Sequence, residues 1–210
     1  MQINTIRGQI ELLSGLHIGG GDDTMKIGGI DNSVVKEANN GRPYIPGSSL
    51  KGKMRSLLEW HYRLVNLPNA DGTPFSSKLM EMVPDGGKKD AENLLKLFGD
   101  PNPDSPYGIT RISVGDCRVS EDSAELELSE AKYENMIDRQ KGTAQHPRQT
   151  ERVPAGVRFD FDIRVKILED DDDEEALMTM VRKGMELIEL DYLGGNGSRG
   201  YGRVKFHDQG

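Results

Sequence analysis

Residues 6–18 read IRGQIELLSGLHI, and this stretch decides the fold. Isoleucine, leucine and small residues occupy one set of alternate positions, whereas the other set carries Arg7, Gln9 and Glu11. Alternation with a period of two over this length predicts a long strand with one buried face. His17 belongs to the set that points away from the predicted core.

Further along the chain, predicted strands and helices follow in an order that is typical of one architecture. After the first strand, periodicity predicts a helix capped by Ser48 or Ser49 and a short helix over 91–98. Strands over 111–119 and 159–167 follow. A helix over 174–190 and a closing strand at 204–206 complete the order. This is the split βαβ order of an α+β protein with a ferredoxin-like (RRM-like) antiparallel sheet.

The length of 210 residues suits one sizeable domain, and the sequence contains no tandem repeat and no second core. We therefore expect a single domain over residues 1–210. Its core is predicted from about 1–65, 105–120 and 155–208, with a helical and loop insertion over about 66–104 and a second insertion over about 120–154.

The net charge of −8 argues against a nucleic-acid partner, but its distribution does not. Seven consecutive acids, EDDDDEE at 169–175, account for almost all of it. Three other stretches are basic: 42–63, where Glu59 is the lone acid, 139–152, where Glu151 is the lone acid, and 194–205, which has none. A basic groove that binds a polyanion and three merely solvated surfaces are both compatible with this pattern.

The single cysteine, Cys117, excludes a disulfide within the chain and fits a reducing cytoplasm. The sequence has no apolar run long enough to span a membrane and no signal-peptide pattern, so we expect a cytoplasmic protein with no membrane partner.

Residues 48–55, SSLKGKMR, place Lys51, Lys53 and Arg55 in the first turns of the predicted helix. The helix dipole makes that end positive, so these cations are unfavourable unless an anion binds there. A bound phosphate would remove the conflict. The alternative is that the cations extend into water at small cost.

Residues 194–203, GGNGSRGYGR, join the last helix to the last strand and bare the backbone amides between Arg199 and Arg203. The loop lacks the ending of a Walker motif, and it follows a helix, unlike a Rossmann turn. Close approach to a sugar-phosphate chain and a plain flexible connection are equally compatible with it.

Three aspartates lie near the first strand. Asp22 and Asp23 follow two glycines, as in polymerase and cyclase palms. A palm also needs a carboxylate on the neighbouring first strand, and the single acid there, Glu11, lies several residues from its end, which favours a turn. Asp31 stands alone, and the residues by themselves favour an Asx-turn there. The four histidines are dispersed and offer no zinc site.

Several motifs together resemble one family. They are GLHIGG at 15–20, IGGID at 27–31, YIPGSSLKGKMRSLLE at 44–59, HPRQTERV at 146–153 and DYLGGNGSRGYGRV at 191–204. In order and spacing they resemble the repeated backbone subunit of the type III-A (Csm) CRISPR effector complex, a RAMP protein. The resemblance runs from Ile3 to Phe206 and is weakest over 66–104.

The resemblance implies that further copies of the chain polymerise along a CRISPR guide RNA together with the other subunits of the type III-A complex. It also implies that a thumb hairpin within 120–154 kinks the paired guide and target RNA. Beside each kink, the target RNA is expected to be cut with Mg²⁺ or Mn²⁺ present. By analogy Asp31 is the catalytic residue, either as a base on the 2′-hydroxyl or as a weak metal ligand.

The basic segments and the glycine-rich loop then become hypotheses for RNA binding. The predicted RNA-binding residues are His17, Lys51, Lys53, Arg55, Arg139, Arg148, Arg152, Gly195, Gly197, Ser198, Arg199, Tyr201 and Arg203. Three alternatives remain open: a non-catalytic RNA scaffold of a related RAMP complex, a nucleotide cyclase that uses Asp22 and Asp23, and a guide-processing ribonuclease for which His17 is slender support.

Overall fold

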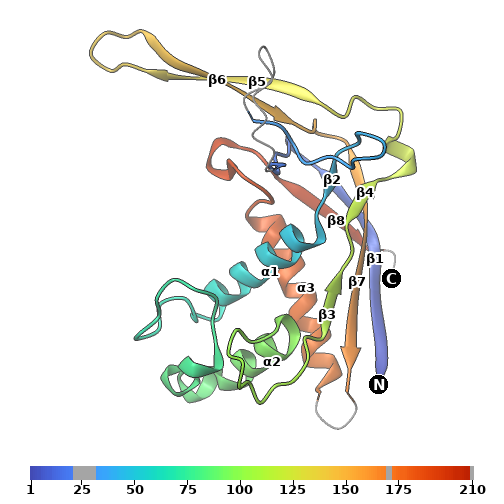
Figure 1. The fold of residues 1–210 in the computed structure, drawn as a ribbon, viewed down its shortest axis with the longest axis vertical. Helices are drawn as coiled ribbons and strands as arrows, with labels where there is room; N and C mark the ends of the chain where they lie inside the picture. The colour runs from blue at the N-terminus through green and yellow to red at the C-terminus, as the bar shows by residue number, and fades with distance from the viewer. Residues whose placement is uncertain (21–31, 169–171, 209–210) are drawn as a thin grey trace.

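The computed structural model describes residues 1–20, 32–168 and 172–208, and it forms a sheet covered by helices with a long hairpin projecting from one end (Figure 1). The strands are β1 (Gln2–Leu12), β2 (Tyr44–Ile45), β3 (Ile112–Val114), β4 (Cys117–Val119), β5 (Glu130–Ile137), β6 (Ala144–Arg152), β7 (Arg158–Ile167) and β8 (Val204–Asp208). The helices are α1 (Gly47–His61), α2 (Lys88–Phe98) and α3 (Glu174–Leu190), with short 3₁₀ turns at Ser77–Met82, Asp85–Gly87, Glu121–Ser123 and Gly197–Arg199.

The main sheet has the ferredoxin-like order. Its strands run β2-β4-β7-β1-β8, with β3 also paired to β7, and every pairing is antiparallel. The register places Ile6 opposite Ile163 and Ile10 opposite Phe159, so the apolar positions of the two central strands share one face. The predicted α+β class and antiparallel sheet are confirmed.

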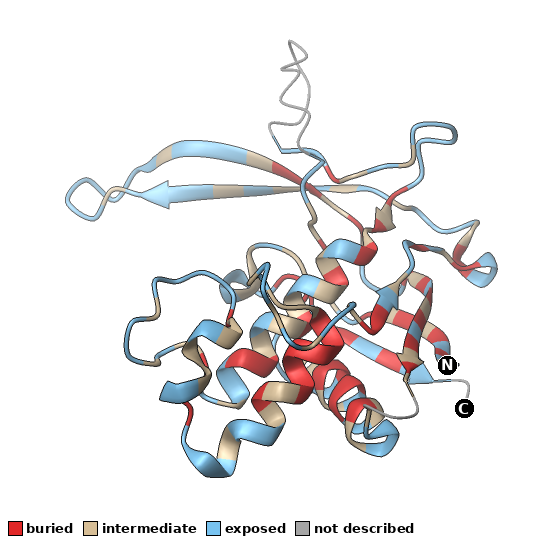
Figure 2. Ribbon diagram, turned by 60° about the horizontal axis from the view of Figure 1, so that its bottom comes forward, coloured by how far each residue is buried: buried red, intermediate tan, exposed pale blue. Residues whose placement is uncertain are grey.

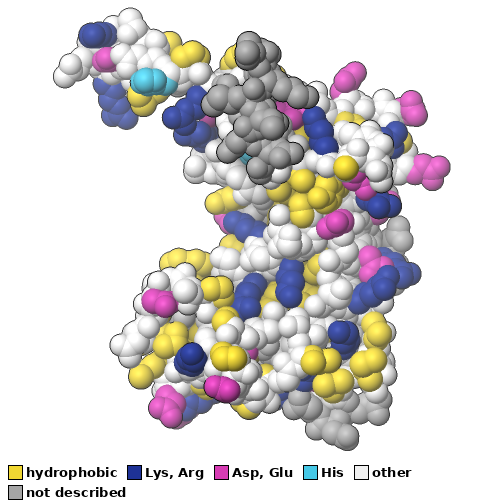
Figure 3. All heavy atoms as spheres, viewed as in Figure 1, with side chains coloured by type: hydrophobic (Ala, Val, Ile, Leu, Met, Phe, Trp, Pro, Cys, Tyr) yellow, Lys and Arg dark blue, Asp and Glu magenta, His cyan; other side chains and the backbone are white. Residues whose placement is uncertain are grey.

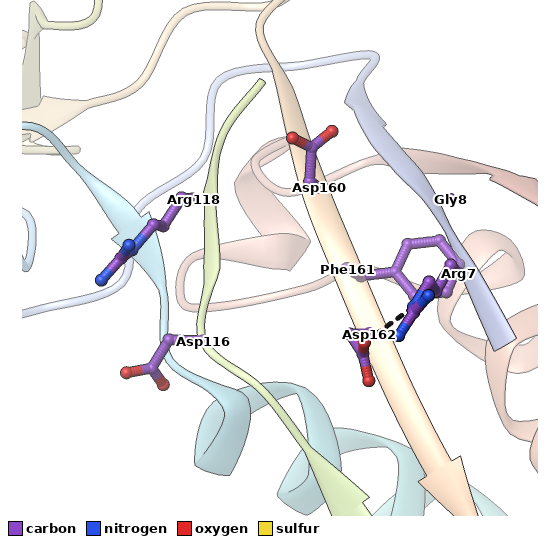
Figure 4. Close-up of a pocket in the computed structure, with 7 residues that line it drawn as sticks. All are labelled: Arg7, Gly8, Asp116, Arg118, Asp160, Phe161 and Asp162. Atoms are coloured by element: carbon purple, nitrogen blue, oxygen red, sulfur yellow. Dashed lines mark hydrogen bonds and ion pairs between the residues drawn. The ribbon is translucent and has the colours of Figure 1, made fainter. Parts of the chain in front are cut away.

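The core lies between this face of the sheet and the helices α1 and α3 (Figure 2). Alternate residues of β7 from Phe159 to Ile167 are buried there, and Leu50, Met54 and Leu58 of α1 are fully buried against them. The opposite face of the sheet carries charged side chains. Arg7, Asp160 and Arg118 belong to a shallow hollow on this open face (Figure 4). None of the described helices is long and apolar enough to cross a membrane.

The first strand is shorter than predicted, because β1 ends at Leu12 rather than Ile18. The amides of Leu13 and Ser14 donate to the carbonyl of Arg203, and Leu16 then pairs with Val153. The apolar alternation continues past Leu12 because Leu16 is buried in the same core, but its backbone has changed partners.

The prediction that Ser48 or Ser49 caps the first helix is wrong. The helix begins one residue earlier, at Gly47, and no side chain of its N-terminal cap residue, Pro46, bonds to it. Instead the Gly47 amide donates to the carboxylate of Asp116, 2.8 Å away in the connection between β3 and β4. An acid distant in sequence thus satisfies the helix N-terminus, which local spacing does not reveal.

Strands β5 and β6 form a separate two-stranded sheet that projects from the body of the protein (Figure 1). Tyr133, Met136 and Ile137 on its outer half are exposed, and a register shift between Glu134 and Met136 interrupts the pairing. Such a hairpin has too little apolar area of its own to order it, so its base must be held by the rest of the fold.

Candidate nucleic-acid interface

The glycine-rich loop 194–203 folds back onto the segment that follows β1. The Gly195 amide donates to the His17 carbonyl at 2.9 Å, and the Gly202 amide donates to the Gly15 carbonyl at 2.9 Å. Gly194 and Gly202 have positive φ, and a Cβ on them would lie 2.4 Å from the His17 carbonyl oxygen and 1.9 Å from the Leu193 carbonyl oxygen. Glycine is therefore required at both positions by conformation and by space.

His17 lies between this loop and the base of the hairpin. Its Nδ1 is 2.7 Å from the carbonyl oxygen of Glu151 on β6, and its side chain is half-buried. The predicted orientation of His17 away from the sheet core agrees with this contact, which sets the imidazole at the junction of the two segments.

Glu151 joins the segments that meet at this junction, and its side chain is buried. Its carboxylate accepts from Lys36 Nζ and Ser129 Oγ, each at 2.6 Å, and from the Val34 amide at 3.0 Å. Burial acts to raise the pKa of Glu151, but these hydrogen bonds outweigh it and the pKa lies below its ordinary value. The Glu151 amide also donates to the carbonyl of Asn32 at 2.9 Å.

Tyr201 connects the loop to the hairpin from the other side. Its ring is fully buried, with Lys132 Nζ 4.5 Å and Arg152 Cζ 5.1 Å from the ring centroid, a geometry that suits cation–π attraction. Arg199 forms an ion pair with Glu134 at 3.0 Å, and the Tyr201 hydroxyl lies 3.4 Å from the same carboxylate. The predicted RNA-binding residues Arg152, Arg199 and Tyr201 thus come together, and they hold the hairpin to the loop.

Two of the three cations at the start of α1 are used inside the protein. Arg55 forms an ion pair with Glu59 at 2.7 Å and donates to the carbonyls of Gly99 and Phe75, so it ties α1 to the insertion. Lys53 forms an ion pair with Asp191 at 2.7 Å. These two ion pairs offset the unfavourable placement of Arg55 and Lys53 at the helix start, so neither cation needs a bound phosphate.

Lys51 differs from these neighbours. Burial, followed by the nearby Arg55 guanidinium, lowers the pKa of its ammonium, and it forms no ion pair with any acid in the described residues. An anion at this position would relieve both effects.

The remaining predicted residues fall into two groups. Gly197 packs its backbone on the ring of Tyr192, where a Cβ would lie 2.1 Å from the ring carbons, and Ser198 lies in the same 3₁₀ turn as Gly197. Arg139, Arg148 and Arg203 form no ion pair with an acid in ranges 1–20, 32–168 or 172–208. Figure 3 shows Lys and Arg side chains both on the hairpin and over the helices below it.

Asp31 and the pair Asp22 and Asp23 lie outside the described residues, so their predicted roles stay predictions. Asn32, which follows Asp31 in sequence, pairs with Thr150 of β6. Within the described part of the chain, no three His, Cys, Asp or Glu side chains gather where they could share a metal ion.

Two important residues, Glu59 and Glu151, were not among the predicted site residues. Each is the lone acid of a basic stretch in the sequence, and each is buried with several donors. The sequence signal for both residues is a single acid within a basic stretch. A buried carboxylate is stabilised most when several hydrogen-bond donors surround it.

Comparison with known proteins agrees with the fold. A family model described as the RAMP superfamily matches residues 9–205, so the protein is of the RAMP class. The curated relative "CRISPR system Cms endoribonuclease Csm3" of Methanocaldococcus jannaschii is 41% identical over 97% of this chain and 78% of its own length. The protein of the same name from Streptococcus thermophilus is 39% identical over 94% of this chain and 84% of its own length. The chain belongs to the Csm3 family within the RAMP superfamily.

Solved structures show the same fold. A chain of the Csm3–Csm4 subcomplex of the type III-A CRISPR-Cas interference complex is 29% identical, with a TM-score of 0.56 over 98% of this chain and 75% of that one. A chain of a type III-B Cmr-beta complex bound to cognate target RNA is 18% identical, with a TM-score of 0.63 over 98% of this chain and 59% of that one. The second likeness supports the fold alone.

Proposed function

We propose that this protein is a backbone subunit of a type III-A CRISPR effector complex, in which copies of the chain assemble along a guide RNA with other subunits and cut target RNA. The observation that carries the proposal is the junction of the glycine-rich loop, His17 and the base of the hairpin, built on a fold whose curated relatives are named endoribonucleases.

The guide RNA lies along this junction and the start of α1. Lys51, Arg148 and Arg203 meet its phosphates, because their charges are not neutralised by acids of the described residues. The bare backbone from Gly195 to Ser198 allows a sugar-phosphate chain to approach closely. Arg55 is assigned to the fold rather than to RNA, since its donors are already engaged.

The hairpin β5–β6 acts on the paired RNA. Its outer half combines exposed apolar side chains with Arg139 and Arg148, so it can press between bases while cations contact phosphates. The contacts of Tyr201 and Glu151 fix its base, which lets an exposed hairpin keep one direction.

Asp31 performs the cut. A kinked target strand can bring its own 2′-hydroxyl in line with the adjacent phosphorus, so that the new O–P bond forms as the bond to the next nucleotide's 5′-oxygen breaks. Asp31 either takes the hydroxyl proton or contributes its carboxylate to a divalent ion, in which case water takes that proton. In both cases water protonates the departing 5′-oxygen.

Mg²⁺ or Mn²⁺ is the proposed cofactor. Such ions often use one or two protein carboxylates and complete their shell with substrate phosphates and water, which the single carboxylate of Asp31 fits. When bound, the ion would stabilise negative charge on the scissile phosphate.

The test is to assemble the complex on a known guide, add matching RNA and map the cuts with the wild-type protein, Asp31→Ala and Asp23→Ala. We expect Asp31→Ala to bind target normally and to lose regular cutting, whereas Asp23→Ala cuts normally. Full-rate cutting by Asp31→Ala would make this chain a scaffold. Loss of cutting with Asp23→Ala, together with cyclic product from ATP and metal, would point to the cyclase alternative.

A further inference from the structure

The imidazole of His17 has a defined proton arrangement. Its Nδ1 lies 2.7 Å from the carbonyl oxygen of Glu151, and a carbonyl oxygen can only accept a hydrogen bond. The Nδ1 atom must therefore carry the hydrogen. In the neutral ring Nε2 is then a lone-pair acceptor, held in one direction by the buried backbone of β6.

The Nε2 edge of the ring is bordered by glycines. A Cβ on Gly19 would lie 3.7 Å from Nε2, and one on Gly195 would lie 3.8 Å from Cδ2, so both approaches lack a side chain. No hydrogen bond joins Nε2 to any other described residue. The edge is thus a half-buried acceptor on the surface where the glycine-rich loop lies.

The neutral form of the ring selects its partner by chemistry. Phosphate oxygens offer no hydrogen and would be repelled by the lone pair, whereas a ribose 2′-hydroxyl can donate. Base amino groups can also donate, but they are present only in some nucleotides. Every ribonucleotide has a 2′-hydroxyl, so a contact with it does not depend on the sequence of the guide.

We propose that His17 Nε2 accepts a hydrogen bond from a 2′-hydroxyl of the guide strand and so makes the subunit select RNA over DNA. This inference rests on the proposed function. It assigns His17 to the sugar rather than to a phosphate, and it assigns Glu151 as the positioning residue that sets the ring's tautomer through its main-chain carbonyl.

The experiment measures binding of the full-length protein to a guide RNA of known sequence, to the same RNA with a single 2′-deoxy nucleotide moved stepwise along it, and to the all-DNA strand. We expect one substitution position in each protein footprint to weaken wild-type binding about five- to tenfold, as for one hydrogen bond. His17→Ala binds the RNA weaker by the same factor and is insensitive to that deoxy position.

His17→Gln is the matched control, because its carboxamide oxygen can reach about the place of Nε2, and it should restore part of the discrimination. Undiminished sensitivity of His17→Ala to the deoxy position would overturn the inference. So would a loss that is equal for RNA and deoxy strands and that lowers the salt dependence, since this would indicate a phosphate contact. RNA binding without any deoxy-sensitive position overturns this inference alone, whereas failure of the wild-type protein to bind the RNA at all overturns the proposed function with it.

Discussion

The start of α1 and the outer half of the β5–β6 hairpin are both rich in cations, but the structure uses them differently. At α1, Arg55 and Lys53 are joined to Glu59 and Asp191 of the protein. On the hairpin, Arg139 forms no ion pair with a described acid and is surrounded by solvent. Cations of the first kind stabilise the fold, and cations of the second kind remain available for a polyanion.

Among the described residues, one ion pair is buried more completely than those at α1. Arg111 and Asp172 are almost completely buried, and Asp172 also accepts from the Leu168 amide. Asp172→Ala should lower the free energy of unfolding by about 3–5 kcal/mol, because the buried Arg111 guanidinium loses the Asp172 carboxylate and keeps only its other contacts. Urea unfolding measures this.

Asp173→Ala is the control for the acidic run, since Asp173 only caps α3 by accepting from the Ala176 amide. Its cost should be about 1 kcal/mol. If the two variants lose equal free energies of unfolding, burial does not determine how much each acid stabilises the fold.

At α1 itself, Arg55→Ala should lower the free energy of unfolding by about 3 kcal/mol, because Glu59 would be left buried without its cation. Lys51→Ala, one turn earlier, should change it by less than about 0.5 kcal/mol, since it removes a charge that Arg55 repels. Urea unfolding of both variants checks the contrast, which fails if Lys51→Ala proves as harmful as Arg55→Ala.

The sequence predicts the helices and strands more completely than it predicts which charged side chains pair with one another. The helical spacing over 174–190 predicts the bounds of α3, and the alternation over 159–167 predicts those of β7 to within one residue. These patterns are local. The partners of Arg55 and Lys53 at Gly99 and Asp191 are distant in sequence, so no local pattern could show that these cations are engaged.

The same limit applies to the ends of elements. The cap of α1 by Asp116 and the exchange of partners after Leu12 depend on segments that meet only in the folded chain. Arg55 and Glu59 are the exception, because a spacing of four residues on one helix predicts their contact.

Glu151 gives a smaller and pH-dependent effect. Because its folded pKa is held below the ordinary 4.5, its contribution is complete above that pH and is lost as pH falls through the folded value. At neutral pH Glu151→Gln should cost about 1–2 kcal/mol. The difference from wild type in urea unfolding should shrink well below pH 4.5, and a difference that stays constant with pH would contradict the assignment.

The most direct test of the account is the salt dependence of guide RNA binding by Lys51→Ala/Arg203→Ala and by Lys53→Ala. The unpaired cations should each lower the slope of log affinity against log salt by about 0.7, whereas Lys53, held by Asp191, should leave it nearly unchanged. An unchanged slope for the double variant, or an equal fall for Lys53→Ala, would show that pairing within the protein does not decide which cations hold the RNA.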